Sequence, residues 1–169
     1  MVIDVKALSK EQLRNLVDNH RKKNATNLTI YSDALAELER REGKGLDFDK
    51  SYEVILKAAR ERRFISYKDL ADASGADWQA VHYSVGKHLG SLVEYAHRRG
   101  WPMLSAIVVN RPNVATGRME PDALRGFVGI ARELDIPVVN EEEFLKDQQR
   151  AVFDWAASLP LGSDGRNKE

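Results

Sequence analysis

Four side chains able to contact a nucleobase fall close together between residues 78 and 83: Trp78, Gln79, His82 and Tyr83. A glutamine can form two hydrogen bonds to the edge of an adenine, and an aromatic ring can stack on an unpaired base or wedge between base pairs. A helix needed only for packing would not require this polar and aromatic set. We therefore expect these four residues to read DNA sequence. The alternative is two short helices packed in an ordinary α-rich domain.

Histidines could also bind a metal ion, and His82, His88 and His97 lie within one stretch of the chain. A metal site needs three or four converging ligands, and no carboxylate stands at a helical spacing from a histidine that would complete one cleanly. Glu94 and His97 are three residues apart, which a surface pair on one helix explains more simply. We expect no metal and no other cofactor.

Catalytic side chains are also weakly indicated. Glu141, Glu142, Glu143 and Lys146 contain the glutamate and lysine elements of a restriction-type nuclease, but the preceding aspartate and the strand placement are missing. Acidic residues in the first turn of a helix explain the three glutamates better. The chain has no cysteine, so it has no thiolate nucleophile. We expect no catalytic residues.

A helix-turn-helix pattern would position residues 78–83. Ser66 can cap a short helix that ends at Gly75, where glycine supplies a left-handed residue, and Asp77 can cap the second helix. In DNA-binding versions the second helix lies in the major groove with its N-terminal residues at base edges. We expect this helix to break near Gly86. The inward-facing residues are apolar: Leu70 and Ala71 in the first helix, Val81 and Val85 in the second.

Charge is distributed unevenly, although the net charge of the chain is zero. Residues 57–118 carry ten basic and five acidic side chains, whereas residues 119–169 carry six basic and eleven acidic ones. A partner feels the local field, so the basic segment favours nucleic acid as its partner. Within it we expect these residues to contact the DNA backbone: Ser66, Tyr67, Lys68, Lys87, Arg111 and Arg118.

The segments around this motif suggest a winged domain over residues 46–120. Residues 46–49 read as a linker, and Ser51 can cap a helix over residues 52–62. A further helix is expected over residues 91–99. The β-branched content of residues 103–109 predicts a strand, and the turn-forming loop 110–118 stands where a wing belongs.

Two further units flank the winged domain. Residues 1–45 predict a helical hairpin whose apolar residues exceed what two short helices bury alone, so we expect it to dimerise or to contact a partner. Residues 121–160 predict a helix, a short strand at 136–139 and a closing helix, an acidic extension that could bind a protein. Residues 161–169 read as a loose tail. The hairpin's apolar residues are Leu13, Leu16, Val17, Leu35 and Leu38.

Residues 57–118 resemble the winged helix-turn-helix of the alkylguanine-DNA alkyltransferases and alkyltransferase-like proteins. The resemblance rests on residues 65–71, on Val85-Gly86, and on Pro102 followed by the 108–109 strand. It implies a DNA platform that works through the minor groove, with Tyr67 at the backbone beside a flipped base. The family's intercalating arginine corresponds in spacing to Tyr83. The family's cysteine after the proline is Met103 here, which excludes alkyl transfer.

These observations together predict an α+β, mostly helical protein of the cytoplasm, since no apolar run reaches the ~18 residues of a membrane span. Its expected partner is double-stranded DNA, through the major or the minor groove, and its expected role is that of a regulator or of a targeting subunit in a DNA-modification, repair or defence system. Two alternatives stay open: a protein-interaction module derived from a winged helix, and a small nuclease or repair factor.

Overall fold

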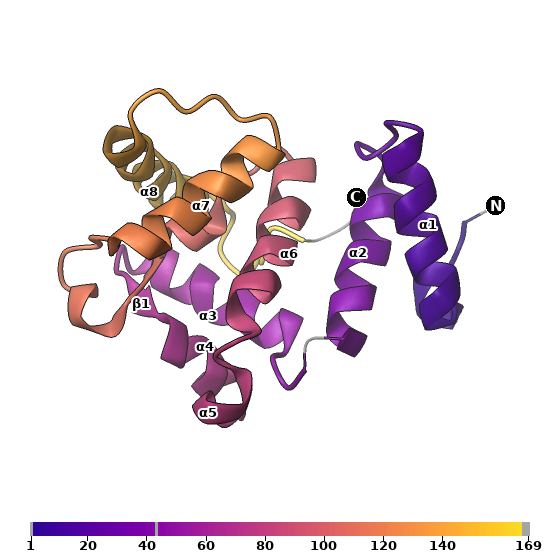
Figure 1. Cartoon of the computed structure of the whole chain (residues 1–169), viewed down its shortest axis with the longest axis horizontal. Helices are drawn as coiled ribbons and strands as arrows, with labels where there is room; N and C mark the ends of the chain where they lie inside the picture. The colour runs from indigo at the N-terminus through magenta and orange to yellow at the C-terminus, as the bar shows by residue number, and fades with distance from the viewer. Residues whose placement is uncertain (1, 43, 167–169) are drawn as a thin grey trace.

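A computed structural model describes residues 2–42 and 44–166, and these residues are mostly helical, as the sequence predicts (Figure 1). The helices are α1 (Lys10–Lys22), α2 (Thr29–Glu42), α3 (Phe48–Arg60), α4 (Tyr67–Ala73), α5 (Trp78–Val81), α6 (Val85–Arg98), α7 (Pro121–Glu133) and α8 (Glu141–Ser158). Short 3-10 helices are η1 (Val5–Ala7), η2 (Leu104–Ile107) and η3 (Arg111–Asn113), and the strands are β1 (Ile65–Ser66) and β2 (Val108–Val109).

The helical hairpin at the N-terminus is confirmed as α1 and α2. Ser9 caps α1 reciprocally with Gln12, because each side chain accepts a hydrogen bond from the other residue's backbone N–H. Leu13, Val17 and Leu35 are buried between the two helices. The hairpin is not a separate lobe, since α2 packs along α6 and lies between α1 and the rest of the molecule (Figure 1).

The predicted linker at residues 46–49 is wrong, because this segment enters the main core. Leu46 and Phe48 are buried there, and α3 begins at Phe48 with Asp47 as its cap. Ser51, predicted to be the cap, is a fully buried residue inside α3. The apolar pattern of α3 therefore starts one turn earlier than the sequence indicates.

Short helices form where the helix-turn-helix is predicted, with a different break. Ser66 caps α4, and Gly75 follows it with φ +68°, as expected. The prediction for the second helix is wrong, since α5 is a single turn. The chain bends after it at residues 82–84, where the Ser84 N–H donates to the Val81 carbonyl at 2.8 Å. Gly86 therefore lies in the first turn of the long α6 and ends no helix.

The two strands pair in parallel, with Ile65 opposite Val108 and Ser66 opposite Val109. Most of the strand predicted at 103–109 is the 3-10 helix η2. The loop 110–118, expected to be a wing, contains η3, and the described residues show no β-hairpin there. The loop is held against the chain by Gly117, over which the ring of Phe64 lies.

The C-terminal third consists of α7 and α8 joined by a loop. The strand predicted at 136–139 is wrong, because no strand lies beside it among the described residues and Pro137 has no N–H to donate. Residues 161–166 are not loose, since Arg166 bonds Asp49 at 2.7 Å and the Tyr52 hydroxyl donates to the Asp164 carbonyl. The rest of the predicted tail, residues 167–169, lies outside the described residues. None of the described helices has the length and apolar character needed to cross a membrane.

Candidate nucleic-acid interface

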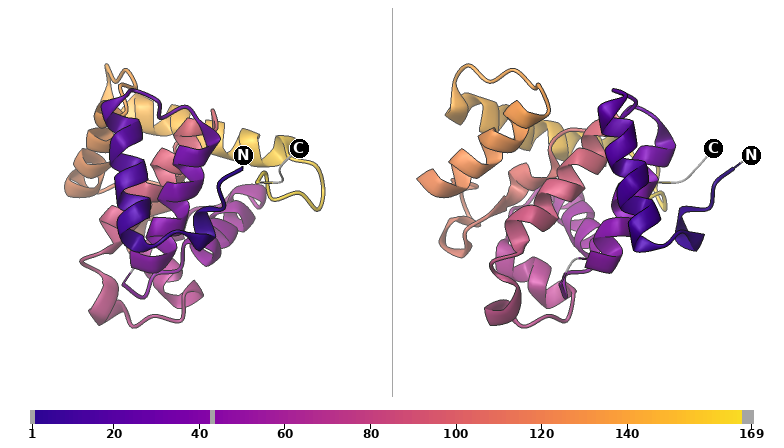
Figure 2. Two further views of the ribbon diagram at one scale, coloured as in Figure 1. Left: turned by 90° about the vertical axis from the view of Figure 1, so that its right-hand side faces the viewer. Right: turned by 45° about the vertical axis from the view of Figure 1, so that its right-hand side comes forward.

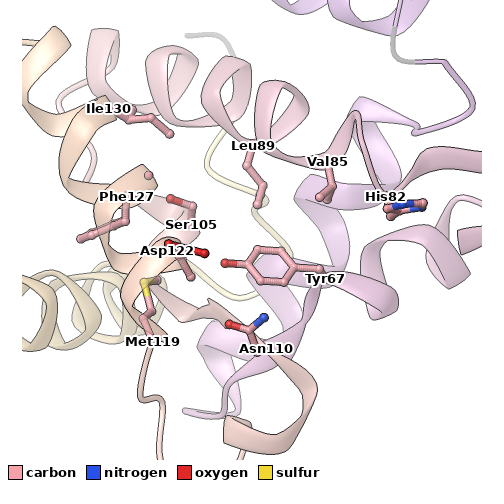
Figure 3. Close-up of a pocket in the computed structure, with 13 residues that line it drawn as sticks. Tyr67, His82, Val85, Leu89, Ser105, Asn110, Met119, Asp122, Phe127 and Ile130 are labelled. Atoms are coloured by element: carbon pink, nitrogen blue, oxygen red, sulfur yellow. The ribbon is translucent and has the colours of Figure 1, made fainter. Parts of the chain in front are cut away.

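A cavity of about 640 Å³ opens beside the N-terminal end of α6 (Figure 3). Its apolar wall comes from α6 and α7, and its polar side chains come from several elements: Tyr67 and Asn110, which follow the two strands, Ser105 of η2, His82, and Asp122 of α7. The parallel register places Ser66 opposite Val109, so the next residues, Tyr67 and Asn110, emerge at the same edge. The lining residues labelled in Figure 3 are Tyr67, His82, Val85, Leu89, Ser105, Asn110, Met119, Asp122, Phe127 and Ile130.

Two polar atoms of the residues that line this cavity lack hydrogen-bond partners. Ser105 Oγ and Asn110 Oδ1 are buried and form no hydrogen bond within the described part of the chain. The Tyr67 hydroxyl points into the cavity between them (Figure 3), and burial raises the pKa of this tyrosine. Buried polar atoms are normally hydrogen-bonded, so the two oxygens without partners beside this space favour a site for a polar ligand.

Two glycines keep the cavity open. Gly86 on α6 and Gly126 on α7 both line it, and a Cβ atom added at either position would meet no atom within 4 Å. Glycine inside a helix destabilises it by roughly 0.5–1 kcal/mol relative to alanine. Close packing of the chain does not require these glycines, so the space that they leave is the feature to explain.

The aromatic residues of the predicted reading helix divide into two environments. Trp78 is half-buried and packs against the core, so it supports the turn. His82 lines the cavity, and its ring centroid lies 3.8 Å from that of Tyr83. Tyr83 is 88% exposed, an unusual state for a large aromatic side chain, and Gln79 is also exposed. Three of the four predicted readers can therefore meet a ligand directly.

The residues expected to contact the DNA backbone also differ in their surroundings. Ser66 is wrong as a contact, because it is buried and its hydroxyl accepts the Asp69 N–H as a helix cap. Tyr67 faces the cavity. Lys68 has a half-exposed side chain that bonds Asp72 at 3.0 Å, a surface pair that a phosphate could replace.

Three further basic residues, Lys87, Arg111 and Arg118, are exposed and form no ion pair among residues 2–42 and 44–166. Lys87 lies in the first turn of α6, and the two arginines lie on loop 110–118. This loop and α5 stand on either side of α4 at one end of the molecule (Figures 1 and 2). Arg111 and Arg118 therefore lie at this end, whereas Lys87 lines a groove together with residues of α1 and α2.

A second polar cluster, which the sequence did not indicate, is sealed in the core. His88 Nδ1 lies 2.7 Å from Glu39 Oε1, and its Nε2 lies 2.8 Å from Ser51 Oγ. This order of acid, histidine and serine is that of a hydrolase triad, but Ser51 is fully buried and no substrate could reach it. The cluster is structural. The signal that could have found it is a histidine within the apolar stripe of Val85, Leu89 and Leu92.

Potential metal ligands do not gather elsewhere, since the described residues contain no group of three or more that could hold an ion. Comparison of the chain with protein-family models, with curated proteins and with solved structures finds no match. The site must therefore be interpreted from its own geometry.

Proposed function

We propose that this protein binds double-stranded DNA at the end formed by α4, α5 and loop 110–118, and receives one unpaired base in the cavity beside α6. The observation that carries the proposal is an aromatic pair, the partly buried His82 and the exposed Tyr83, at a cavity whose buried Ser105 and Asn110 oxygens have no partner among the described residues. In its biological setting the protein would act as a regulator or as a targeting subunit of a DNA-modification, repair or defence system.

Tyr83 supplies the means of opening the duplex. An aromatic ring inserted between base steps compensates for the stacking that a displaced base loses, which is worth roughly 1–3 kcal/mol per base. Its neighbour Gln79 is exposed on the preceding turn, where its amide can bond to a base edge. The helix α5 spans only four residues, about 6 Å at 1.5 Å per residue, so a turn rather than a long recognition helix would present these side chains.

The cavity matches a heteroaromatic ring in size and chemistry. Its volume falls within the range of about 300–1,000 Å³ that is usual for small-molecule sites. Val85, Leu89 and Phe127 offer apolar contact to the faces of a ring. Tyr67 and Ser105 have hydroxyls that donate or accept, and Asn110 has an amide that does both, so the edge of a base could satisfy all three.

The direct test is a duplex that carries 2-aminopurine opposite a mismatched base. Its fluorescence is quenched by stacking, so extrusion into the cavity should raise the emission, and the mismatched duplex should bind more tightly than the fully paired one. Tyr83→Ala should abolish the rise in emission. If the parent protein binds no duplex at ~50 mM salt, or binds without any change in emission, the proposal is contradicted.

Two glycine variants separate filling of the cavity from loss of fold. Gly126→Leu places a side chain in the cavity, whereas Gly129→Leu adds the same side chain to the same helix at a position that does not line it. Both replace a helical glycine with a good helix former, so neither should lower the urea midpoint. Only Gly126→Leu should weaken binding to the mismatched duplex, by roughly ten-fold or more. Equal affinity of the two variants would mean that no base enters the cavity.

A further inference from the structure

We infer that Arg62 and Arg63 form a second phosphate-binding point for the same DNA, on the side of loop 110–118 away from α5. This inference rests on the proposed function, which places the DNA at α4, α5 and loop 110–118. Residues 57–63 contain four basic and one acidic side chain, so they hold much of the positive charge of the basic segment. Arg62 and Arg63 are both exposed there, directly before β1.

The position of these arginines relative to the loop is fixed by Phe64. A Cβ atom at Gly117 would lie 2.3 Å from the tip of the Phe64 ring, so the loop backbone is seated directly on that ring. Phe64 also stacks edge-on against Phe153 of α8, with centroids 5.5 Å apart. The turn at 62–64 and the loop that carries Arg111 and Arg118 therefore form one continuous surface, which a single backbone can follow.

The backbone of Arg62 is held in a conformation that suits glycine better. Its φ is +51°, in the left-handed region, at the position after the end of α3 where helices favour glycine. The hydrogen bonds of such an ending are present, with Arg63 N–H donating to Ala58 and Arg62 N–H donating to Ala59. Asn24, Lys44 and Asp135 have similar φ values, so the backbone alone assigns no role to this residue, and any role of Arg62 must come from its exposed, charged side chain.

The ion pairs of these arginines do not supply that role. Arg62 approaches Asp154 only to 3.3 Å, and the two side chains are 55% and 74% exposed. Its guanidinium also lies 5.4 Å from the centroid of the Phe153 ring, a cation–π contact worth roughly 0.5–1 kcal/mol at an exposed site. Arg63 pairs with its near neighbour Glu61, which is also half-exposed. Exposed pairs of this kind contribute little to stability and are screened by salt, so a phosphate can displace the carboxylates.

The experiment measures the dependence of duplex affinity on salt for the parent and for the double variant Arg62→Gly/Arg63→Gln, with a mismatched duplex of ~20 base pairs as the probe. Removing one protein–phosphate ion pair reduces the slope of log affinity against log salt by about 0.9, so the double variant should reduce it by about 2. The variant Arg63→Lys should retain the slope of the parent. The urea midpoint of Arg62→Gly should equal or exceed that of the parent, because glycine relieves the left-handed backbone.

The matched control is Lys22→Gln, which removes an exposed positive charge at the C-terminal end of α1. It should leave the slope unchanged. If the parent binds DNA and the double variant keeps its full slope, the inference is wrong while the proposed function stands. If the parent itself binds no duplex, the proposed function fails first. A double variant with a lowered urea midpoint would assign the arginines to the fold and also contradict the inference.

Discussion

His88 connects three helices from a fully buried position. Its ring bonds Glu39 of α2 and Ser51 of α3, and the second carboxylate oxygen of Glu39 accepts the Ser91 hydroxyl of α6 at 3.1 Å. Low local dielectric strengthens these bonds, and the same low dielectric makes an unpaired member costly. The cluster therefore sets how α6 lies against the other two helices, and α6 carries one wall of the cavity.

Removing one side chain of this cluster should lower the free energy of unfolding. His88→Ala leaves Glu39 buried with only one partner, so we expect a loss of about 3 kcal/mol in the free energy of unfolding, measured by urea titration at pH 7. Glu39→Ala should cost a comparable amount, and the double variant should cost less than the sum by at least about 1 kcal/mol. His97→Ala, at a partly exposed histidine of the same helix, should stay within about 0.5 kcal/mol of the parent. Additive losses would mean that the two side chains act independently.

Residue types alone indicated part of the candidate site. Tyr83, Gln79 and His82 were proposed because polar and aromatic side chains on an otherwise apolar pattern stand out. Ser66 and Ser51 were misassigned because a serine near the start of a helix has the same sequence signature whether its hydroxyl caps the helix, meets a ligand or bonds a distant histidine. Ser105 and Asn110 left no signal at all, since only the three-dimensional arrangement of the described residues leaves their oxygens without partners.

The periodicity of apolar residues predicted the helices, whose positions depend on packing against the core. It failed for the strands, because a strand also needs a second strand to pair with. Val81 and Val85 both face the core as predicted, yet the chain bends between them, because one apolar stripe can cross a turn between two helices. Residues 136–139 have strand-forming composition, but a strand needs a neighbour to bond, and the described residues provide none. Composition cannot reveal whether a neighbour is present.

The seating of loop 110–118 on Phe64 gives a prediction at the level of the element. Gly117 and Gly75 both have left-handed φ values, +75° and +68°, but only Gly117 has a side chain against it. Gly75→Ala should therefore lower the free energy of unfolding by about 1 kcal/mol, because of the backbone alone. Gly117→Ala should lower it by at least about 1 kcal/mol more, because Phe64 must move away from Phe153. Urea unfolding of the two variants measures the difference. Equal losses would show that the loop is not seated on the ring.

Across the whole molecule, the buried tyrosines make stability sensitive to alkali. Burial, followed by a hydrogen bond to Glu94, raises the pKa of Tyr31 to about 12, and burial raises the pKa of Tyr52, Tyr67 and Tyr95. The unfolded chain loses these protons near pH 10, before the folded chain does. The stabilisation is therefore complete below pH 10 and is lost as pH rises toward 12, at about 1.4 kcal/mol for each unit of separation.

A variant of Tyr31, the buried tyrosine of the helical hairpin, tests this alkaline loss of stability. Tyr31→Phe should reduce the loss of unfolding free energy between pH 10 and pH 12 by about 2 kcal/mol, since that side chain no longer titrates. The measurement is urea unfolding at closely spaced pH values. An identical alkaline loss in the parent and in Tyr31→Phe would mean that this hydroxyl ionises as freely in the folded protein as in the unfolded one.

Both ends of the described chain border one cavity, which is lined by residues 2–6 together with Asp164 and Arg166. The ends therefore meet in the folded protein, whereas unfolding expands the radius of gyration of such a chain from about 15 Å to about 43 Å. Because the sequence contains no cysteine, one thiol introduced near each end would be unique. A donor and an acceptor fluorophore at these thiols would transfer energy strongly while the protein is folded and weakly once it opens. The folding of this protein can thus be followed by single-molecule energy transfer between its two ends.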